Sequence, residues 1–135
     1  MSSPSTPPRP TDAELAILRV LWQRGPSTVR EVHDALTGTG DGKAVRYTTT
    51  LKQLQVMTDK GLVRRDERSR THVYEAASSE EETQGALLEH LLRSAFGGSA
   101  QQLFLRALSR KVASAEELDE LRRLLDERGR GDGER

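Results

Sequence analysis

The residues in this chain that could do chemistry gather around position 48. Polar side chains follow one another there, with a cation at the start: Arg46, Thr48, Thr49, Lys52, Gln53 and Gln55. Threonine methyl groups can contact thymine methyls, side-chain amides can pair with adenine, and cations can bind phosphates. If residues 45–60 form a helix, these side chains lie on one face, and that face is typical of a helix that reads base edges. The alternative is an ordinary solvent face, which usually carries more Glu and Lys.

The net charge of the whole chain is zero, but the charges are unevenly distributed. Residues 1–42 carry four basic and five acidic side chains, and residues 75–135 carry nine basic and thirteen acidic ones. The segment between them, residues 43–74, carries eight basic and three acidic side chains, a net charge of +5. A basic segment in a neutral protein indicates a local binding surface for a polyanion, although an unevenly charged solvent surface would show the same pattern.

The sequence gives little support to other kinds of chemistry. The chain has no cysteine, which excludes disulfides, thiolate metal sites and thiol nucleophiles. His33, His72 and His90 lack the spacing of metal ligands, and the carboxylates stand at helix starts, where capping explains them. The glycine-rich run 37–42 lacks the lysine and the preceding strand of a phosphate-binding loop, so we expect a flexible loop. We therefore expect neither an enzyme nor a cofactor.

Nothing in the sequence predicts contact with a membrane. No stretch is apolar for long enough to span one, and residues 1–10 lack the apolar core of a signal peptide. We expect residues 1–10 to be a disordered arm and residues 130–135 to be a disordered tail. The expected location is the cytoplasm.

Two helices are predicted in the first forty residues. The first, at residues 11–23, begins with a capping box and continues with an apolar stripe: Thr11 with Glu14, then Leu15, Leu18 and Trp22. It ends before the Gly-Pro pair at 25–26, because proline cannot continue a helix. Ser27 or Thr28 can cap a second, shorter helix, whose apolar face consists of Val29, Val32 and Leu36.

A third helix and a basic hairpin follow. The helix spans residues 45–60 and ends at Gly61, and its core-facing side is expected to consist of Tyr47, Leu51, Leu54 and Met57, with Thr50 at the edge. Residues 62–65 and 71–74 are β-prone, and two arginines lie near the tip of the turn between them, where a wing would meet the sugar-phosphate backbone. These elements predict a mostly α-helical protein with a small β-hairpin, whose head, residues 11–77, is a winged helix-turn-helix domain.

Residues 78–129 predict a tail of three amphipathic helices. Two capping boxes, Ser79 with Glu82 and Ser114 with Glu117, mark helix starts, and a Gly-Gly pair at 97–98 interrupts the pattern. The leucine stripes are too large to be buried within one short tail, so we expect two tails to pair in a symmetric, obligate dimer. The alternative is that the stripes fold back on the head of their own chain. The candidate dimerisation residues are Leu87, Leu88, Leu91, Leu92, Leu103, Phe104, Leu108, Leu118, Leu121 and Leu125.

The order of these elements resembles a known family, the penicillinase and methicillin-resistance repressors together with the copper-responsive repressors (BlaI/MecI/CopY). The resemblance covers residues 11–129. It rests on DAE at 12–14, VLW at 20–22, GPSTVREV at 25–32, YTTTL at 47–51, KGLV at 60–63 and VY at 73–74. It implies a dimeric repressor that binds inverted-repeat operators through the third helix of each head.

The sequence departs from the family pattern at three places. Members usually carry an arginine in the third helix where this chain has Val56, so its operator is expected to differ. The copper branch uses a cysteine pair in the tail, which is absent here, so copper sensing by that route is excluded. In the antibiotic-resistance branch a protease cuts an Asn-Phe bond, whereas this chain has Arg106-Ala107 at the aligned place. A membrane sensor protease would then act on this protein only indirectly.

Taken together, the sequence predicts a homodimeric, sequence-specific repressor whose partner is double-stranded operator DNA. The alternative is a winged-helix module whose basic face binds an acidic protein, and salt-sensitive binding to duplex DNA would separate the two. The candidate DNA contacts are Thr28, Lys43, Arg46, Tyr47, Thr48, Thr49, Lys52, Gln53, Arg68 and Arg70.

Overall fold

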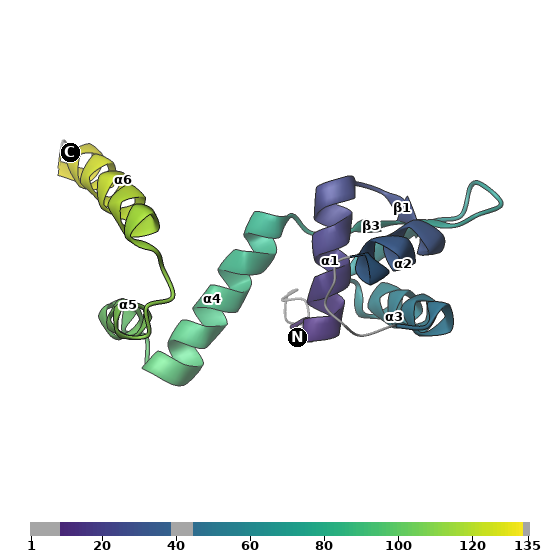
Figure 1. The fold of residues 1–135 in the computed structure, drawn as a ribbon, viewed down its shortest axis with the longest axis horizontal. Coiled ribbons are helices and arrows are strands. Elements are labelled where there is room, and N and C mark those ends of the chain that lie inside the picture. Colours follow the sequence, from purple (N-terminus) through teal and green to yellow (C-terminus); the bar gives the residue numbers. More distant parts are fainter. Residues whose placement is uncertain (1–8, 39–44, 134–135) are drawn as a thin grey trace, which may run out of the picture. The chain divides into compact units, whose positions relative to one another are not determined.

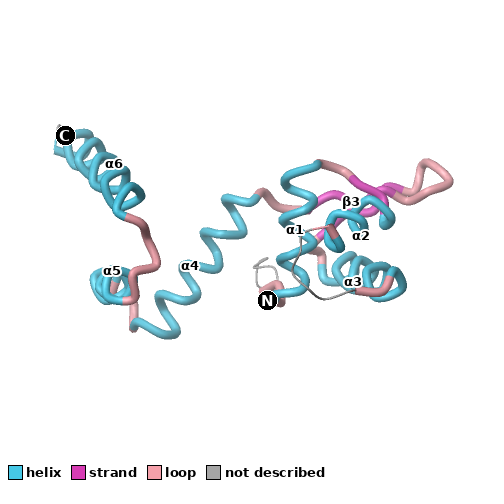
Figure 2. The backbone as a smooth tube through the Cα atoms, viewed as in Figure 1, coloured by secondary structure: helices cyan, strands magenta, loops and turns pink. Residues whose placement is uncertain are grey.

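The structure is a computed structural model that describes residues 9–38 and 45–133, with side chains to residue 129 (Figure 1). Its elements are α1 (Asp12–Arg24), β1 (Ser27–Thr28), α2 (Val29–Thr37), α3 (Tyr47–Lys60), β2 (Val63–Asp66), β3 (Val73–Ala76), α4 (Glu80–Phe96), α5 (Ala100–Ser109) and α6 (Ala115–Gly133). Lys43 and most of the predicted glycine-rich loop lie outside the described residues, as do residues 1–8 and 134–135. Among the described residues, strands occur only in the head (Figure 2).

The chain divides into two compact units, residues 1–87 and 88–135. The division falls inside α4, ten residues beyond the boundary expected from the sequence. The first unit holds the whole head, and the second holds most of the tail.

The start of α1 follows from the predicted capping box. The Glu14 amide donates to Thr11 Oγ1 at 3.1 Å, and the Thr11 amide donates to Glu14 Oε1 at 2.9 Å. These two bonds satisfy amide groups that have no partner within the helix itself. Gly25, with φ of 88°, ends the helix, because a left-handed backbone suits a residue without a Cβ. The predicted capping box is confirmed, and the helix ends one residue later than expected.

The hairpin is part of a three-stranded antiparallel sheet with the order β1-β3-β2. Strand β2 pairs with β3 in the register Val63 to Ala76, and β1 pairs with the other edge of β3 through Ser27 and Tyr74. The hairpin was predicted from its β-prone residues, and its strands begin one to two residues later than expected. Strand β1 was not predicted, because two residues carry no alternating pattern. The turn between β2 and β3 projects beyond the helices of the head (Figure 1).

The core of the head lies where the three helices and the sheet meet. Its fully buried side chains come from α1, α2, α3 and both hairpin strands: Ile17, Leu18, Leu21, Val32, Leu54, Met57, Val63 and Tyr74. Trp22 packs against this core, and its Nε1 donates to the carbonyl oxygen of Ser78 at 2.9 Å. Every large element of the head therefore contributes to one apolar cluster. This shared packing fixes the position of α3 relative to the other helices and the sheet.

A partly buried ion pair joins the start of α1 to the end of α3. Lys60 Nζ lies 2.8 Å from Glu14 Oε2, and the side-chain exposures are 34% and 2% respectively. Burial alone raises the pKa of Glu14, but hydrogen bonds from Lys60 and Thr11 and the charge of Lys60 outweigh it, and the net pKa lies below its ordinary value of 4.5. The pair therefore ties down the far end of α3.

Helix α3 buries most of the predicted residues, and two of its residues, Tyr47 and Thr50, differ from the prediction. Leu54 and Met57 lie in the core and Leu51 is half-buried, as expected. Thr50, expected at the edge, is fully buried, whereas Tyr47, expected in the core, is 36% exposed. The placement of Tyr47 in the core was wrong, because the ring lies at the first turn of the helix and contacts side chains of α2. Gly61 adopts the predicted left-handed cap, with φ of 81°.

Helices α4 and α6 of the tail begin at the predicted capping boxes, and the tail helices bury little. Ser79 and Glu82 bond reciprocally, and so do Ser114 and Glu117, which confirms both capping boxes. Helix α6 extends to Gly133, past the expected helix end at residue 129. Among the tail residues whose side chains the structure describes, none is buried. Within the described residues, no helix has the length and apolarity that crossing a membrane requires.

Candidate nucleic-acid interface

The exposed face of α3 carries the polar residues that the sequence singled out. Thr48, Thr49, Lys52 and Gln55 are exposed, and Gln53 is half-buried. The opposite face is anchored by three fully buried side chains, Thr50, Leu54 and Met57. The buried face thus fixes the helix in the core, and its polar face is exposed to solvent. The first acidic residue of α3 is Asp59, near the end of the helix.

The start of α3 suits an anion. Arg46 is the N-cap residue, its side chain makes no capping bond, and the first turn has no acidic residue. The partial positive charge of the helix N-terminus therefore remains uncompensated, which favours a phosphate near it. Arg46 itself is exposed.

Val56, the residue that departs from the family pattern, lies on the same exposed side of α3. Its side chain is 36% exposed, one helical turn after Lys52. An apolar group there can contact a thymine methyl but cannot donate a hydrogen bond to guanine as an arginine would. This residue therefore belongs to the candidate interface, although it was not among the predicted contacts.

Thr28 has a structural role that limits what it can do at an interface. Its Oγ1 accepts from the Glu31 amide at 3.1 Å, and its own amide donates to Glu31 Oε1 at 2.9 Å. This second capping box starts α2. The hydroxyl proton is the part of the Thr28 side chain that remains available to a phosphate oxygen.

Two residues of α2 that sequence reasoning missed contact Tyr47. The guanidinium carbon of Arg30 lies 4.6 Å from the centre of the Tyr47 ring, and the His33 ring meets the same ring edge-on with centroids 5.6 Å apart. The interplanar angle of the two rings is 76°. No periodic signal marks such a contact, because it depends on how two helices cross.

The predicted wing arginines differ from each other. Arg70 is exposed, whereas Arg68 forms a two-pronged ion pair with Asp66, through Nη2 at 2.8 Å and Nε at 3.1 Å to the two carboxylate oxygens. The Arg68 amide also donates to Asp66 Oδ1 at 3.0 Å. Hydrogen bonds from the Arg68 side chain and amide lower the pKa of Asp66 to about 2. Arg68 therefore reaches the wing tip with its charge already balanced.

The base of the wing shows the same pairing. Arg65 Nε lies 2.7 Å from Glu67 Oε2. Hydrogen bonding with the Tyr74 hydroxyl, and then with Glu67, raises the pKa of the Arg65 guanidinium. Since Tyr74 is almost fully buried, Arg65 is tied to the hairpin.

The sequence that forms this head and tail matches a known protein family over most of its length. A family model described as penicillinase repressor matches residues 10–127. The chain belongs to the penicillinase repressor family. Membership confirms the resemblance and makes the protein a DNA-binding transcriptional repressor. The three helices and the antiparallel sheet of the head have the winged-helix arrangement that the sequence predicts.

Individual relatives agree with the family match. Two curated proteins, each named transcriptional regulator BlaI, come from Mycobacterium tuberculosis strains CDC 1551 / Oshkosh and ATCC 25618 / H37Rv. Each is 35% identical over 126 residues, which cover 92% of this chain and 88% of the relative. A solved structure, the solution structure of Bacillus licheniformis BlaI in its monomeric form in complex with the blaP half-operator, is 25% identical, with a TM-score of 0.48. That match covers 57% of this chain and 90% of the other.

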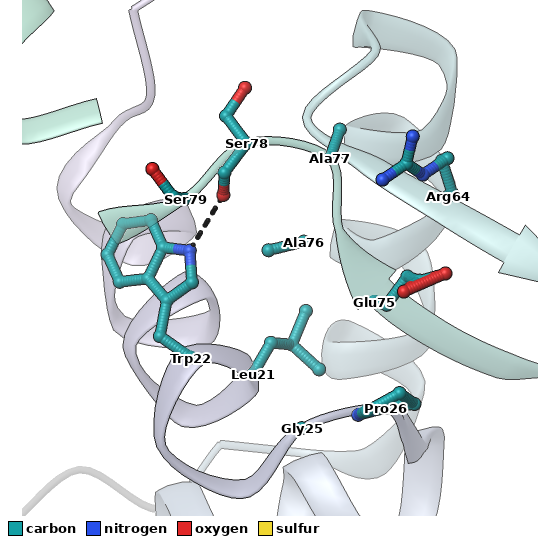
Figure 3. Close-up of a pocket in the computed structure, with 10 residues that line it drawn as sticks. All are labelled: Leu21, Trp22, Gly25, Pro26, Arg64, Glu75, Ala76, Ala77, Ser78 and Ser79. Carbon is teal, nitrogen blue, oxygen red and sulfur yellow. Dashed lines mark hydrogen bonds between the residues drawn. The ribbon is translucent and has the colours of Figure 1, made fainter. Parts of the chain in front are cut away.

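This penicillinase repressor family member also has a cavity of about 320 Å³ at the base of the wing. Figure 3 shows Trp22 on one side of it and Arg64 with Glu75 on the other. Trp22 Nε1, the indole donor at its rim, is already bonded to Ser78. Within the described residues no buried side-chain nitrogen or oxygen lacks a partner, so no buried polar group in this cavity is left over for a ligand.

The tail of this family member exposes most of the predicted dimerisation residues. Leu87, Leu92 and Leu103 are half-buried, and the other seven are exposed. Leu124, part of the predicted third stripe, is also exposed, as are Leu105 and Val112, which were not singled out. The exposed fractions of these large apolar side chains in the tail range from 36% to 72%.

Proposed function

We propose that this protein acts as a homodimer on an inverted-repeat operator, and that α3 of each head reads one half-site. The observation that carries the proposal is the exposed polar face of α3, with Thr48, Thr49 and Lys52 on a helix whose other face is fully buried. A helix of this kind can lie in the major groove while its hydroxyl and ammonium groups meet base edges and phosphates. Thr48 and Thr49 are assigned to bases.

The remaining candidate contacts are assigned to the DNA backbone. Arg46 lies at the helix N-terminus, and Lys52 and Arg70 are exposed cations on α3 and the wing. Side chains at such positions fix the register of a protein on the duplex without reading sequence. We assign the same role to Thr28 and Tyr47, which lie at the starts of α2 and α3, and Lys43 remains a proposed contact from the sequence.

The tail supports pairing of two chains. Its stripes leave leucines exposed that a monomer would have to keep in water, and covering them with a second tail would remove that apolar area from solvent. A dimer also matches a two-fold operator, because two heads are needed for two half-sites. The proposed interface consists of the ten candidate residues together with Leu105, Val112 and Leu124.

We further propose that release from the operator does not proceed by cutting the Arg106-Ala107 bond. That bond lies inside α5, and an arginine stands where a protease of the antibiotic-resistance branch would need an asparagine. A membrane sensor protease would then act through another component, and the repressor would stay in the cytoplasm with its DNA.

The test is selection of binding sites from random duplex DNA with the full chain, followed by sedimentation of the complex. We expect two symmetric half-sites whose centres lie about one helical turn, 10–10.5 base pairs, or a multiple of it apart. The complex is expected to contain two chains. An asymmetric single site would contradict the dimer on an inverted repeat. Failure to bind any duplex, with binding to an acidic protein instead, would support the interaction-module alternative.

A further inference from the structure

Tyr47 is held in place by two side chains of α2. Arg30 stacks on its ring at 4.6 Å, and His33 meets its edge with ring centroids 5.6 Å apart. Because Tyr47 is the first residue of α3 and directly precedes Thr48 and Thr49, these contacts fix the part of α3 that begins the exposed polar face. The ring thus connects α2 to the start of that face.

The other end of this contact is anchored in the core. His33 Nδ1 lies 3.2 Å from the hydroxyl oxygen of Thr50, and Thr50 is fully buried. His33 is therefore fixed between a buried hydroxyl and the Tyr47 ring. A ring supported in this way has little freedom to swing away from the guanidinium that rests on it.

Arg30 differs from the arginines of the wing. Arg65 and Arg68 are paired with the carboxylates of Glu67 and Asp66. For Arg30, the contact found among the described residues is the Tyr47 ring, and no carboxylate there lies within ion-pair distance of its guanidinium. A guanidinium stacked on an aromatic ring keeps its N–H donors, which point outward in the plane of the group. Arg30 is thus an oriented cation whose charge is not balanced.

We propose that Arg30 binds a phosphate of the DNA backbone, and that Tyr47 is the platform that positions it. The inference rests on the proposed function, since it places the phosphate beside the base contacts of Thr48 and Thr49. Two guanidinium N–H groups can donate to two phosphate oxygens while the ring supports the other side of the cation. Arg30 would then hold the start of α3 at a fixed depth in the groove.

The test compares Arg30→Ala, Tyr47→Leu, the double variant and a matched control, Arg19→Ala, which removes an exposed arginine from α1. Each full-length variant is titrated with a labelled random-sequence duplex of about 20 base pairs and with the selected operator, over a range of salt concentrations. Circular dichroism melting checks that each head stays folded. The readouts are the dissociation constant and its salt slope, which reports the number of phosphates contacted.

Arg30→Ala is expected to lower affinity at least about tenfold on both duplexes and to reduce the salt slope by about 0.9 for each bound head, the value for one phosphate contact, which makes about 1.8 for a dimer with both heads on the duplex. Tyr47→Leu should lose part of the same slope, and the double variant should lose no more slope than Arg30→Ala alone, because the ring acts through the cation. Arg19→Ala should match the wild type.

Two results would overturn the proposal. If Arg30→Ala keeps the full salt slope while the wild type binds both duplexes, the cation does not touch phosphate. If the slopes lost by the single variants add in the double variant, Tyr47 does not position Arg30. A wild type that binds neither duplex would instead contradict the proposed function itself, so the two failures are distinguishable.

Discussion

The head and the tail are both built from capped amphipathic helices, yet only the head buries a core. In the head, eleven apolar side chains from three helices and a sheet are almost fully buried. In the described tail no side chain is buried, and most of its large apolar residues are exposed, by fractions between 36% and 72%. Equally regular amphipathic helices can therefore bury their apolar faces within one chain, as in the head, or leave them exposed, as in the tail. The head can be stable by itself, whereas the tail helices leave apolar surface that a second chain can cover.

The largest expected effect comes from placing charges in the tail. Leu88, Leu91 and Leu121 replaced together by Asp would put unpaired charges into the proposed interface, at a cost of several kcal/mol. We expect a monomer by sedimentation, a head that melts as in the wild type, and operator affinity reduced at least about a hundredfold, because the second head is no longer tethered near its half-site. Melting is followed by circular dichroism and affinity by fluorescence anisotropy.

A matched control places charge on the opposite sides of the same helices. Glu89→Lys with Asp119→Lys changes exposed polar positions of α4 and α6 and should leave the dimer intact. A triple leucine variant that sediments as a monomer yet binds the full operator as tightly as the wild type would show that dimerisation does not provide the affinity.

The second prediction concerns the stability of the head alone. Lys60→Met removes the cation that faces the buried Glu14 carboxylate, and we expect the free energy of unfolding to fall by about 2–3 kcal/mol. That is less than the loss for a fully enclosed pair, because the Lys60 side chain is 34% exposed. Urea unfolding followed by Trp22 fluorescence measures it. Oligomeric state should not change, which separates this effect from that of the tail.

The same ion pair gives a pH dependence of known sign. The pKa of Glu14 is lower in the folded head than its ordinary value of 4.5, so the unfolded chain binds more protons in this range. The stabilisation is therefore complete above pH 4.5 and is lost as the pH falls through the folded pKa. Glu14→Gln should flatten this part of the profile. An unchanged acid limb in that variant would assign the acid sensitivity to other carboxylates.

The third prediction distinguishes the base contacts of the head from its phosphate contacts. Thr48→Ala and Thr49→Ala should each weaken operator binding by about 1–3 kcal/mol and leave binding to random duplex nearly unchanged, since base contacts are lost and phosphate contacts stay. Thr58→Ala is the control, because that threonine lies on the same helix but donates its hydroxyl proton to the Leu54 carbonyl oxygen. Equal losses on the operator and on random duplex would remove both threonines from the set of base contacts.

Much of the head follows from local sequence signals. The capping residues, the glycines at 25 and 61 and the buried leucines act within a few residues of themselves, so the helices could be predicted with small errors at their ends. Tyr47 and Thr50 were misplaced for a different reason. A helical stripe predicts the direction of a side chain but not what neighbouring elements put there, and α2 supplies a cation and a ring that hold Tyr47 at the surface.

In the candidate site, too, some features follow from local sequence and others depend on contacts between elements. The polar face of α3 could be predicted, because it repeats along one helix. Arg30 and His33 could not, since their contacts with Tyr47 depend on how α2 crosses α3. Strand β1 was missed because only pairing with β3 makes two residues a strand. Arg68 was correctly expected on the wing, but its ion pair with Asp66, two residues away, has no counterpart in the charge count of the segment.

The smallest expected effect concerns that ion pair, which makes the wing a weaker cation than its sequence indicates. To bind a phosphate, Arg68 must exchange the Asp66 carboxylate for it, and at a pKa of about 2 that carboxylate stays charged at any pH suitable for binding. Both side chains are well exposed, so solvent screens the pair and the exchange costs little. Asp66→Asn should therefore raise affinity for every duplex about two- to fivefold and steepen the salt slope. Arg68→Ala combined with Asp66→Asn should cancel the gain in affinity. Arg70→Ala should lower the salt slope by the same amount whether or not Asp66 is replaced. If Asp66→Asn leaves both affinity and slope unchanged, Arg68 does not reach the DNA, and Arg70 is the wing's arginine contact.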